Sequence, residues 1–185
     1  CDGTLIDTIM TAASFESQPL PQLVFKEVLS NPIDDCPEFI ELQNTGVRAV
    51  SSSIILEVDK ELVVLPAHLR IPANGFIVVT PNYITFDKCY DLPNNATLVQ
   101  VSFPDLKISE QSLRIMSRDG GVIDEVLLAE SMHFIDDDKE GYSLEKYRKG
   151  WTSCVDISKS SPGRFTDVVV KGKPFILNKE LIYDL

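Results

Sequence analysis

The stretch that decides the fold runs from residue 112 to residue 128 and reads SLRIMS, RDGG, VIDEVLL. Two segments rich in apolar and β-branched residues, 112–117 and 122–128, flank the four residues RDGG. The Asp119-Gly120 pair supplies the positive φ angles that a tight hairpin turn requires. This pattern predicts a β-hairpin.

Residues 22–30 (QLVFKEVLS) show the two-residue alternation of a strand for part of their length. Leu23, Phe25 and Leu29 then fall on one face of the strand, and Lys26 falls on the other. The turn residues that follow predict that this strand ends near residue 30.

Residues 38–43 (EFIELQ) repeat the alternation, with Ile40 and Leu42 on one face and Glu41 between them. This spacing predicts a second strand, buried on one side only. Residues 76–80 (FIVVT) form instead a continuous apolar run between turn residues, which predicts a strand buried on both faces.

Further short apolar segments follow one another along the chain, separated by turn residues. They cover residues 50–58, 62–65, 97–103 and 141–147. Only residues 81–89 and 108–111 leave room for a helical turn. Roughly eight or nine short strands predict an all-β fold, an antiparallel β-sandwich or barrel.

The charge balance excludes some classes of partner. The 185 residues carry 17 basic and 28 acidic side chains, a net charge of −11. Such a charge opposes broad binding to the phosphates of nucleic acids or to an anionic membrane face. The longest apolar runs are four residues, so we expect no transmembrane segment.

The two ends of the chain differ from its middle. We expect residues 1–19 to be a linker or the end of a preceding domain, 20–166 to be the sandwich, and 167–185 to be a linker or the first strand of a following domain. The sequence is then a piece of a longer protein. The alternative is that Cys1 is the lipid-bearing first residue of a mature bacterial lipoprotein.

Four cysteines, at positions 1, 36, 89 and 154, share no C-x-x-C spacing. With two distant histidines they do not resemble a zinc site. Their even number permits two disulfides in any of three pairings, and buried free thiols are the alternative.

Candidates for catalysis are few. The sequence lacks the G-x-S-x-G, H-E-x-x-H and P-loop motifs. Cys154 and His133 are the one Cys/His pair close enough in sequence to weigh as a nucleophile and base. A buried thiol and a loop imidazole are the alternative, which we favour.

Seven motifs follow one another along the chain. They are FKEVLSNP (25–32), EFIELQN (38–44), IPANGFIVVT (71–80), the hairpin at 112–126, GYSLE (141–145), Trp151 and SPG (161–163). Together they resemble the lamin-tail domain in its bacterial form. The resemblance covers roughly residues 20–165. It implies an immunoglobulin-like β-sandwich that acts as a non-catalytic module of a large secreted or cell-surface protein. Nuclear members of the family contact chromatin, a role that the net charge of −11 argues against here.

The densest acidic cluster is Asp136, Asp137, Asp138 and Glu140. Closely spaced carboxylates beside a glycine suit a hard cation, so a calcium loop is one hypothesis. The cluster lacks the spacing of a calcium-binding loop and contains Lys139, so we favour a solvated loop.

Trp151, Tyr142 and Tyr147 form the second candidate site. Flat aromatic faces with polar edges suit carbohydrate rings, so these side chains are a candidate platform for sugars. Packing in the core is the alternative, which we favour for Trp151.

The sequence therefore predicts a binding or spacer module without catalytic activity or a required cofactor. We expect it to lie beside other domains in a secreted, periplasmic or outer-membrane-associated bacterial protein, with a protein or polysaccharide ligand. The alternative is an accessory domain of an exported hydrolase that contacts substrate through the aromatic side chains or adheres through calcium. Fold alone does not decide between them.

Overall fold

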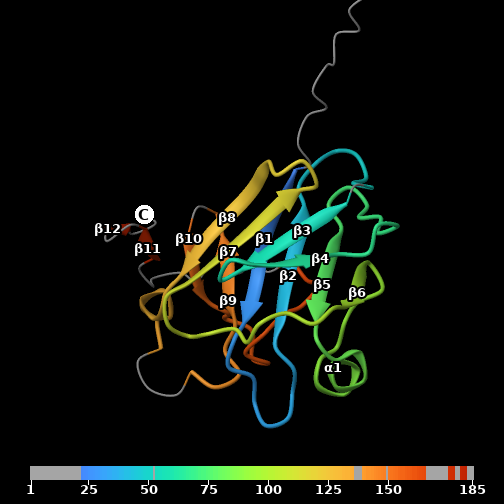
Figure 1. Cartoon of the computed structure of the whole chain (residues 1–185). Coiled ribbons are helices and arrows are strands. Elements are labelled where there is room, and N and C mark those ends of the chain that lie inside the picture. Colours follow the sequence, from blue (N-terminus) through green and yellow to red (C-terminus); the bar gives the residue numbers. More distant parts are fainter. Residues whose placement is uncertain are drawn as a thin grey trace, which may run out of the picture.

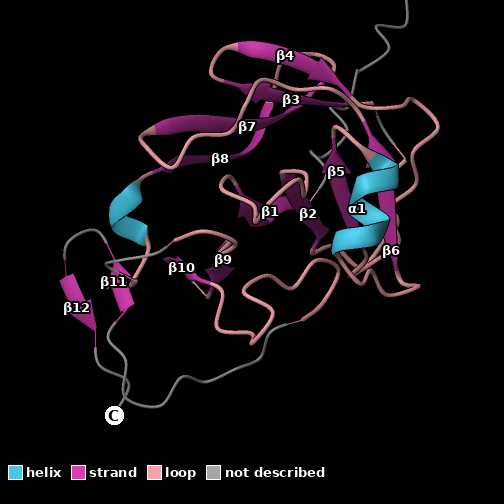
Figure 2. Cartoon of the chain, turned by 90° about the horizontal axis from the view of Figure 1, so that it is seen from below, coloured by secondary structure: helices cyan, strands magenta, loops and turns pink. Residues whose placement is uncertain are grey.

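Two β-sheets, of six and four strands, pack face to face as a sandwich (Figures 1 and 2). The computed structural model describes residues 22–51, 53–135, 139–148, 150–165, 175–177 and 180–182. The predicted β-sandwich is confirmed. The expected domain boundaries, at residues 19/20 and 166/167, fall outside the described residues.

The six-stranded sheet has the order β10 (Gly150–Ser153), β9 (Leu144–Tyr147), β1 (Leu23–Leu29), β2 (Phe39–Asn44), β5 (Phe76–Thr80) and β6 (Ala96–Gln100). The four-stranded sheet has the order β4 (Glu61–Val64), β3 (Ile54–Val58), β7 (Gln111–Ser117) and β8 (Val122–Leu128). A 3-10 turn, η1 (Glu130–Met132), follows β8, and β11 (Phe175–Leu177) pairs with β12 (Glu180–Ile182) near the end of the chain.

The β7–β8 hairpin forms where the sequence predicts it. Its turn uses one left-handed residue, because Gly120 has φ +89° and Asp119 does not have a positive φ. The backbone N–H of Ser117 donates to the carbonyl of Gly121 at 2.8 Å and closes the turn.

One pair of strands departs from the predicted antiparallel pattern, since β5 and β6 run parallel. Parallel neighbours need a crossover connection. Here the helix α1 (Tyr83–Cys89) provides it, capped by the Asn82 side chain, which accepts from the Thr85 N–H at 3.1 Å. Of the two segments that left room for a helical turn, 81–89 contains α1, whereas 108–111 forms a bend that leads into β7 at Gln111.

Strand β1 contains a β-bulge that the alternation did not reveal. Phe25 lies opposite Leu42 and Glu27 lies opposite Glu41, so Lys26 is the extra residue. The bulge reverses the alternation beyond it. Leu29 therefore faces away from Phe25, and the prediction that they share a face is wrong.

The main core fills the space between the sheets and contains Phe25, Val28, Leu42, Ile77 and Leu113, among others. A second, smaller core lies on the outer face of the six-stranded sheet. It consists of Leu29, Phe39, Val78 and Phe86 of α1. Strand β2 is therefore buried on both sides, and the prediction that it is buried on one side only is wrong.

The side chain of Asn44 fixes the end of β2. Its Nδ2 donates to the carbonyls of Arg48, Ile71 and Pro72 at 2.8, 3.1 and 2.9 Å. Its Oδ1 accepts from the Gly46 N–H at 2.9 Å. The amide thus ties the end of β2 to three loop carbonyls, of which those of Ile71 and Pro72 also accept the backbone N–H groups of Val50 and Gly75.

A disulfide joins Cys36, in the β1–β2 loop, to Cys89 at the end of α1. The structure thus selects one bridge from the pairings that the sequence left open. Cys154 is a buried free thiol, and Cys1 lies outside the described residues. Among the described residues, no helix has the length and apolar character of a membrane span.

We predict that reduction of this disulfide destabilises the sandwich. A bridge with a sequence separation of 53 residues restricts the unfolded chain and stabilises the fold by roughly 4 kcal/mol in the chain-entropy description. Urea unfolding with and without dithiothreitol measures the loss. The double variant Cys36→Ser/Cys89→Ser is the control, and an equal effect of dithiothreitol on it would contradict the prediction.

Candidate functional site

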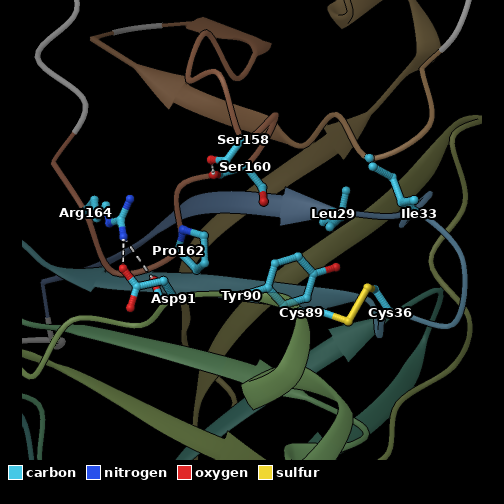
Figure 3. A pocket seen from close by; sticks show the side chains of 11 residues that line it. Leu29, Ile33, Cys36, Cys89, Tyr90, Asp91, Ser158, Ser160, Pro162 and Arg164 are labelled. Atoms are coloured by element: carbon cyan, nitrogen blue, oxygen red, sulfur yellow. Dashed lines mark hydrogen bonds and ion pairs between the residues drawn. A yellow bond between two sulfur atoms is a disulfide. The ribbon is translucent and has the colours of Figure 1, made fainter.

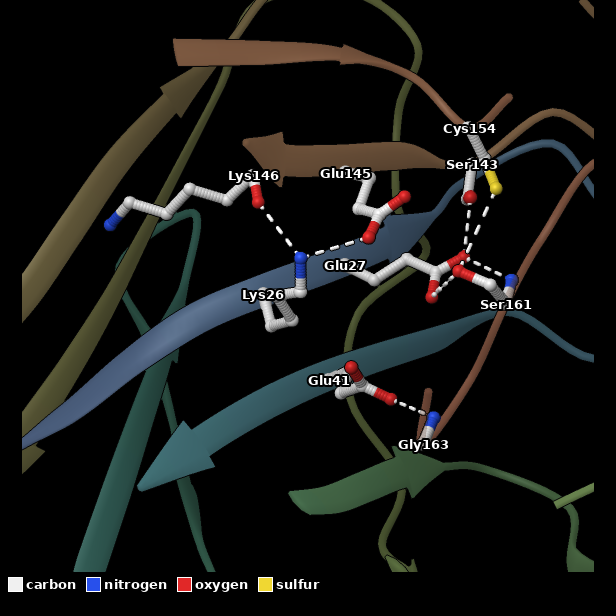
Figure 4. A network of polar contacts seen from close by, with 9 residues as sticks. All are labelled: Lys26, Glu27, Glu41, Ser143, Glu145, Lys146, Cys154, Ser161 and Gly163. Atoms are coloured by element: carbon white, nitrogen blue, oxygen red, sulfur yellow. Dashed lines mark hydrogen bonds and ion pairs between the residues drawn. The ribbon is translucent and has the colours of Figure 1, made fainter. Parts of the chain in front are cut away.

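Three carboxyl groups form a row across the outer face of the six-stranded sheet (Figure 4). Glu27 of β1 lies opposite Glu145 of β9 on one side and opposite Glu41 of β2 on the other. Cross-strand neighbours have their Cα atoms only about 5 Å apart. The exposed fractions of Glu27, Glu41 and Glu145 are 1%, 0% and 4%, so we call these three side chains the buried carboxyl row.

The central member, Glu27, accepts hydrogen bonds from two other segments. Its Oε1 accepts from Ser143 Oγ at 2.5 Å and from the Ser161 backbone N–H at 2.8 Å. The Ser161 hydroxyl adds a contact to Oε2 at 3.3 Å. Ser143 and Ser161, which lie 116 and 134 positions from Glu27 along the chain, thus converge on its carboxyl group.

The outer two members differ in their partners. Glu145 forms an ion pair with Lys26 Nζ at 2.8 Å, and this ammonium also donates to the Lys146 carbonyl. Glu41 Oε2 accepts from the Gly163 N–H, whereas Glu41 Oε1 is buried without a hydrogen-bond partner. The Lys26 ammonium therefore contacts one of the three carboxyl groups directly, and its charge opposes the pKa shifts of the other two.

Burial raises the pKa of every member of the row, because a low-dielectric surrounding disfavours the charged form. The pKa of Glu27 rises to about 7, although its bonds to Ser143 and Ser161 oppose the shift. Burial and the neighbouring Glu27 raise the pKa of Glu41 well above its usual value. Burial also raises the pKa of Glu145, against the effect of Lys26. The direct ion pair with Lys26 thus favours the charged form of Glu145, while burial favours the neutral form of Glu41.

Residues 154–165, which we call the closing segment, cover this row. Ser161 and Gly163 donate their N–H groups to Glu27 and Glu41, and the ring of Phe165 packs edge-on against Phe76 with the centroids 4.7 Å apart. The segment thus follows the sheet surface without joining it as a strand.

A cavity of about 160 Å³ lies beside the closing segment (Figure 3). Its lining includes three alternate residues of that segment, Ser160, Pro162 and Arg164. The Cys36–Cys89 disulfide and Tyr90 line it from the other side. Figure 3 shows the Arg164–Asp91 ion pair at one end of the cavity and the disulfide at the other.

Most of the predicted calcium loop lies outside the described residues, namely Asp136, Asp137 and Asp138. Glu140 is described, and its backbone carbonyl accepts from Lys159 Nζ at 2.9 Å. Within the described part of the chain, no group of three or more His, Cys, Asp or Glu side chains has the geometry to hold a metal ion. The calcium loop stays a prediction.

The three aromatic candidates do not form one platform. Trp151 lies opposite Lys146 and Tyr147 lies opposite Gly150, so the two rings point to opposite faces of the β9–β10 pair. Trp151 packs against the main core. Tyr142 lies before β9, with Lys159 Nζ 4.7 Å from its ring centroid.

Cys154 and His133 each contact a serine side chain. His133 Nδ1 lies 2.9 Å from Ser153 Oγ, and Cys154 Sγ lies 3.6 Å from Ser161 Oγ. Burial raises the pKa of the Cys154 thiol to about 12 and lowers the pKa of His133 to about 4. A reactive cysteine needs the opposite shift.

A scan against models of known protein families finds no match to this chain, and a search of curated proteins finds none either. The resemblance to the lamin-tail domain stays a prediction.

The buried carboxyl row and the cavity are the features that the sequence did not predict. One signal was available for two of the three carboxyl groups, since Glu27 and Glu41 lie in strands that are otherwise largely apolar. An acidic residue in a strand is predicted to face solvent unless the sequence shows that another segment covers that face of the sheet.

We predict that Gly163→Ala loosens the closing segment. Gly163 has φ +76°, and a Cβ there would lie 2.7 Å from Ala96 Cβ. Gly120 has φ +89° with open space around it, so Gly120→Ala is the matched control. The left-handed backbone costs each variant about 1 to 2 kcal/mol, and the clash costs Gly163→Ala roughly 1 to 3 kcal/mol more.

Urea unfolding measures the two costs. Hydrogen exchange at residues 161–165 then locates the change, which we expect to be faster only in Gly163→Ala. Equal destabilisation by both variants would contradict a close fit of the segment to the sheet.

We also predict an unusual dependence of stability on pH. Because burial raises the pKa of Glu27 from 4.5 to about 7, the folded protein keeps a proton that the unfolded chain releases. The resulting stabilisation is complete below pH 4.5 and is lost as the pH rises through 7, a change of about 3 kcal/mol. Glu27→Gln removes this titration, so the stability of the native protein relative to the variant falls over this range.

The comparison with Glu27→Gln cancels the opposite contribution of His133, which is present in both proteins. Its lowered pKa gives a stabilisation that is lost as the pH falls from 6.5 towards 4. Glu125→Gln removes an exposed carboxyl group from β8 and is the control. A difference that stays constant or rises with pH would contradict the assignment of the proton to Glu27.

Proposed function

We propose that this chain is a non-catalytic binding or spacer module of a larger exported bacterial protein, resembling the lamin-tail domain. The sandwich is then of the immunoglobulin-like type. The observation that carries the proposal is the convergence of separate motifs on the buried carboxyl row.

Four of the seven motifs supply polar groups to the same network. Glu27 comes from FKEVLSNP and Glu41 from EFIELQN, while GYSLE supplies both Ser143 and Glu145. The SPG motif supplies the N–H groups of Ser161 and Gly163. The convergence gives the resembling motifs one shared structural role, which supports the family resemblance more than their order along the chain does.

The states of the candidate catalytic groups support a non-catalytic role. The raised pKa of Cys154 keeps its thiol protonated at neutral pH. His133 is 8% exposed and its imidazole nitrogen contacts Ser153, so solvent and substrate have little access to it.

The Cys36–Cys89 disulfide supports location outside the cytoplasm, although weakly. Structural disulfides form and persist in oxidising compartments such as the periplasm and the cell surface. The family resemblance supports two further parts of the proposal. The module lies beside other domains of a longer chain, and it binds a protein or a polysaccharide.

The second candidate is an accessory domain that contacts the substrate of an exported hydrolase. The cavity favours it, because a pocket formed in advance beside an ion pair has the form of a small-molecule site.

Thiol trapping in the source cells tests the proposal. Cells are treated with iodoacetamide before lysis, fractionated, and the protein is digested and analysed by mass spectrometry. We expect a linked peptide containing Cys36 and Cys89 in the periplasmic or surface fraction, on a polypeptide longer than these 185 residues. The cysteines of a cytoplasmic protein in the same sample are the control and should be alkylated.

Alkylated Cys36 and Cys89 in the cytoplasmic fraction would contradict export. Hydrolase activity of the purified chain that Cys154→Ala or His133→Ala abolishes, while the variant keeps its fold, would contradict a non-catalytic role.

A further inference from the structure

The cavity beside the closing segment has rigid walls. The Cys36–Cys89 disulfide forms part of one wall, and the ring of Pro162 forms part of another. Gly141 packs so tightly that a Cβ there would lie 2.5 Å from Ile33 Cγ1. Walls that do not need to be ordered on binding reduce the entropic cost of taking up a ligand.

Tyr90 is held in place at the centre of this wall. Its hydroxyl donates to the Pro37 carbonyl at 3.0 Å. Its ring packs against Phe39 and Phe86, with centroid distances of 5.4 and 4.7 Å. The remaining surface of the ring contributes to the cavity, beside Leu29 and the disulfide (Figure 3).

The rim carries groups that can both donate and accept hydrogen bonds. Arg164 pairs with Asp91, and their side chains are 41% and 89% exposed. An ion pair so exposed contributes little to stability, so a ligand can share its partners at low cost. The lining also includes Ser160, whose hydroxyl is a further donor and acceptor.

The cavity has room for one ring. Its volume of about 160 Å³ is close to that of an apolar protein cavity of roughly 150 Å³ that holds benzene. Here a guanidinium and a carboxylate stand at the rim, so a ring with polar substituents suits the site better than a purely apolar one.

The charges indicate a neutral ligand. Arg164 and Asp91 cancel each other at the rim, and the net charge of −11 opposes an anion. A neutral sugar places its C–H faces against Tyr90 and the apolar walls, and its hydroxyl groups against the charged pair. We propose that this cavity is a binding site for one pyranose unit of a neutral polysaccharide.

This inference rests on the proposed function as a binding module and names its ligand class. It places the sugar at the cavity, away from the aromatic candidates Trp151 and Tyr147. The two proposals are tested independently, because the result of the thiol-trapping experiment does not depend on sugar binding.

A titration of the ¹⁵N-labelled chain, followed by ¹H–¹⁵N NMR, tests the proposal. The probes are glucose, galactose, mannose and N-acetylglucosamine, each added to tens of millimolar. We expect at least one of them to give saturable shifts at the amides of Tyr90, Asp91, Ser160 and Arg164.

Variants at the rim and elsewhere separate binding from folding. Arg164→Ala should weaken the affinity about tenfold or more, as loss of a hydrogen bond to a charged group does. Arg118→Ala, on the exposed β7–β8 turn, is the matched control and should bind normally. Tyr90→Phe keeps the ring and should also bind, and the dispersion of the spectra reports whether each variant is folded.

Three outcomes would overturn the proposal. They are the absence of saturable shifts at the cavity with all four sugars, shifts centred instead on Trp151, and equal weakening by Arg118→Ala and Arg164→Ala. Each of these leaves the proposal of an exported, non-catalytic module intact, since only thiol trapping tests export.

Discussion

Two backbone N–H groups, those of Ser161 and Gly163, hold together the polar layer on the outer face of the six-stranded sheet. They donate to Glu27 and Glu41, which are 1% and 0% exposed. A buried carboxyl group without partners costs several kcal/mol. The closing segment therefore stabilises the carboxyl groups, and the carboxyl groups fix the path of a segment that forms no strand over this sheet.

The bulge at Lys26 makes this arrangement possible. Without an extra residue in β1, the alternation begun by Leu23 and Phe25 would place Glu27 in the main core. The bulge instead brings Glu27 into register with Glu41 and Glu145 on the outer face. The ammonium group of the bulged residue, Lys26, forms an ion pair with Glu145. One inserted residue thus accounts for the register, for the ammonium group beside Glu145 and for the position of Leu29 in the second core.

The sequence predicted the features that depend on local patterns. The β7–β8 hairpin follows from its turn residues, and β5 follows from an apolar run that is buried on both faces. The bulge and the parallel β5–β6 pair escaped prediction because both depend on how one strand pairs with the next, which the spacing within a single strand does not show. The carboxyl row escaped for a similar reason, since Ser161 lies 134 residues from Glu27 along the chain. No spacing rule shows which segment will cover an acidic strand.

The closing segment also couples the two parts of the candidate site. Ser161 and Gly163 bond to the carboxyl row, while the residues between and beside them, Pro162 and Arg164, line the cavity. A change in the protonation of Glu27 alters the strength of the bond from Ser161, because a charged acceptor binds an N–H group more strongly than a neutral one. The added charge also opposes burial beside Glu41 and Glu145. The carboxyl row and the cavity are therefore joined by one short segment, which bonds to the first through alternate backbone N–H groups and lines the second with the residues between and beside them.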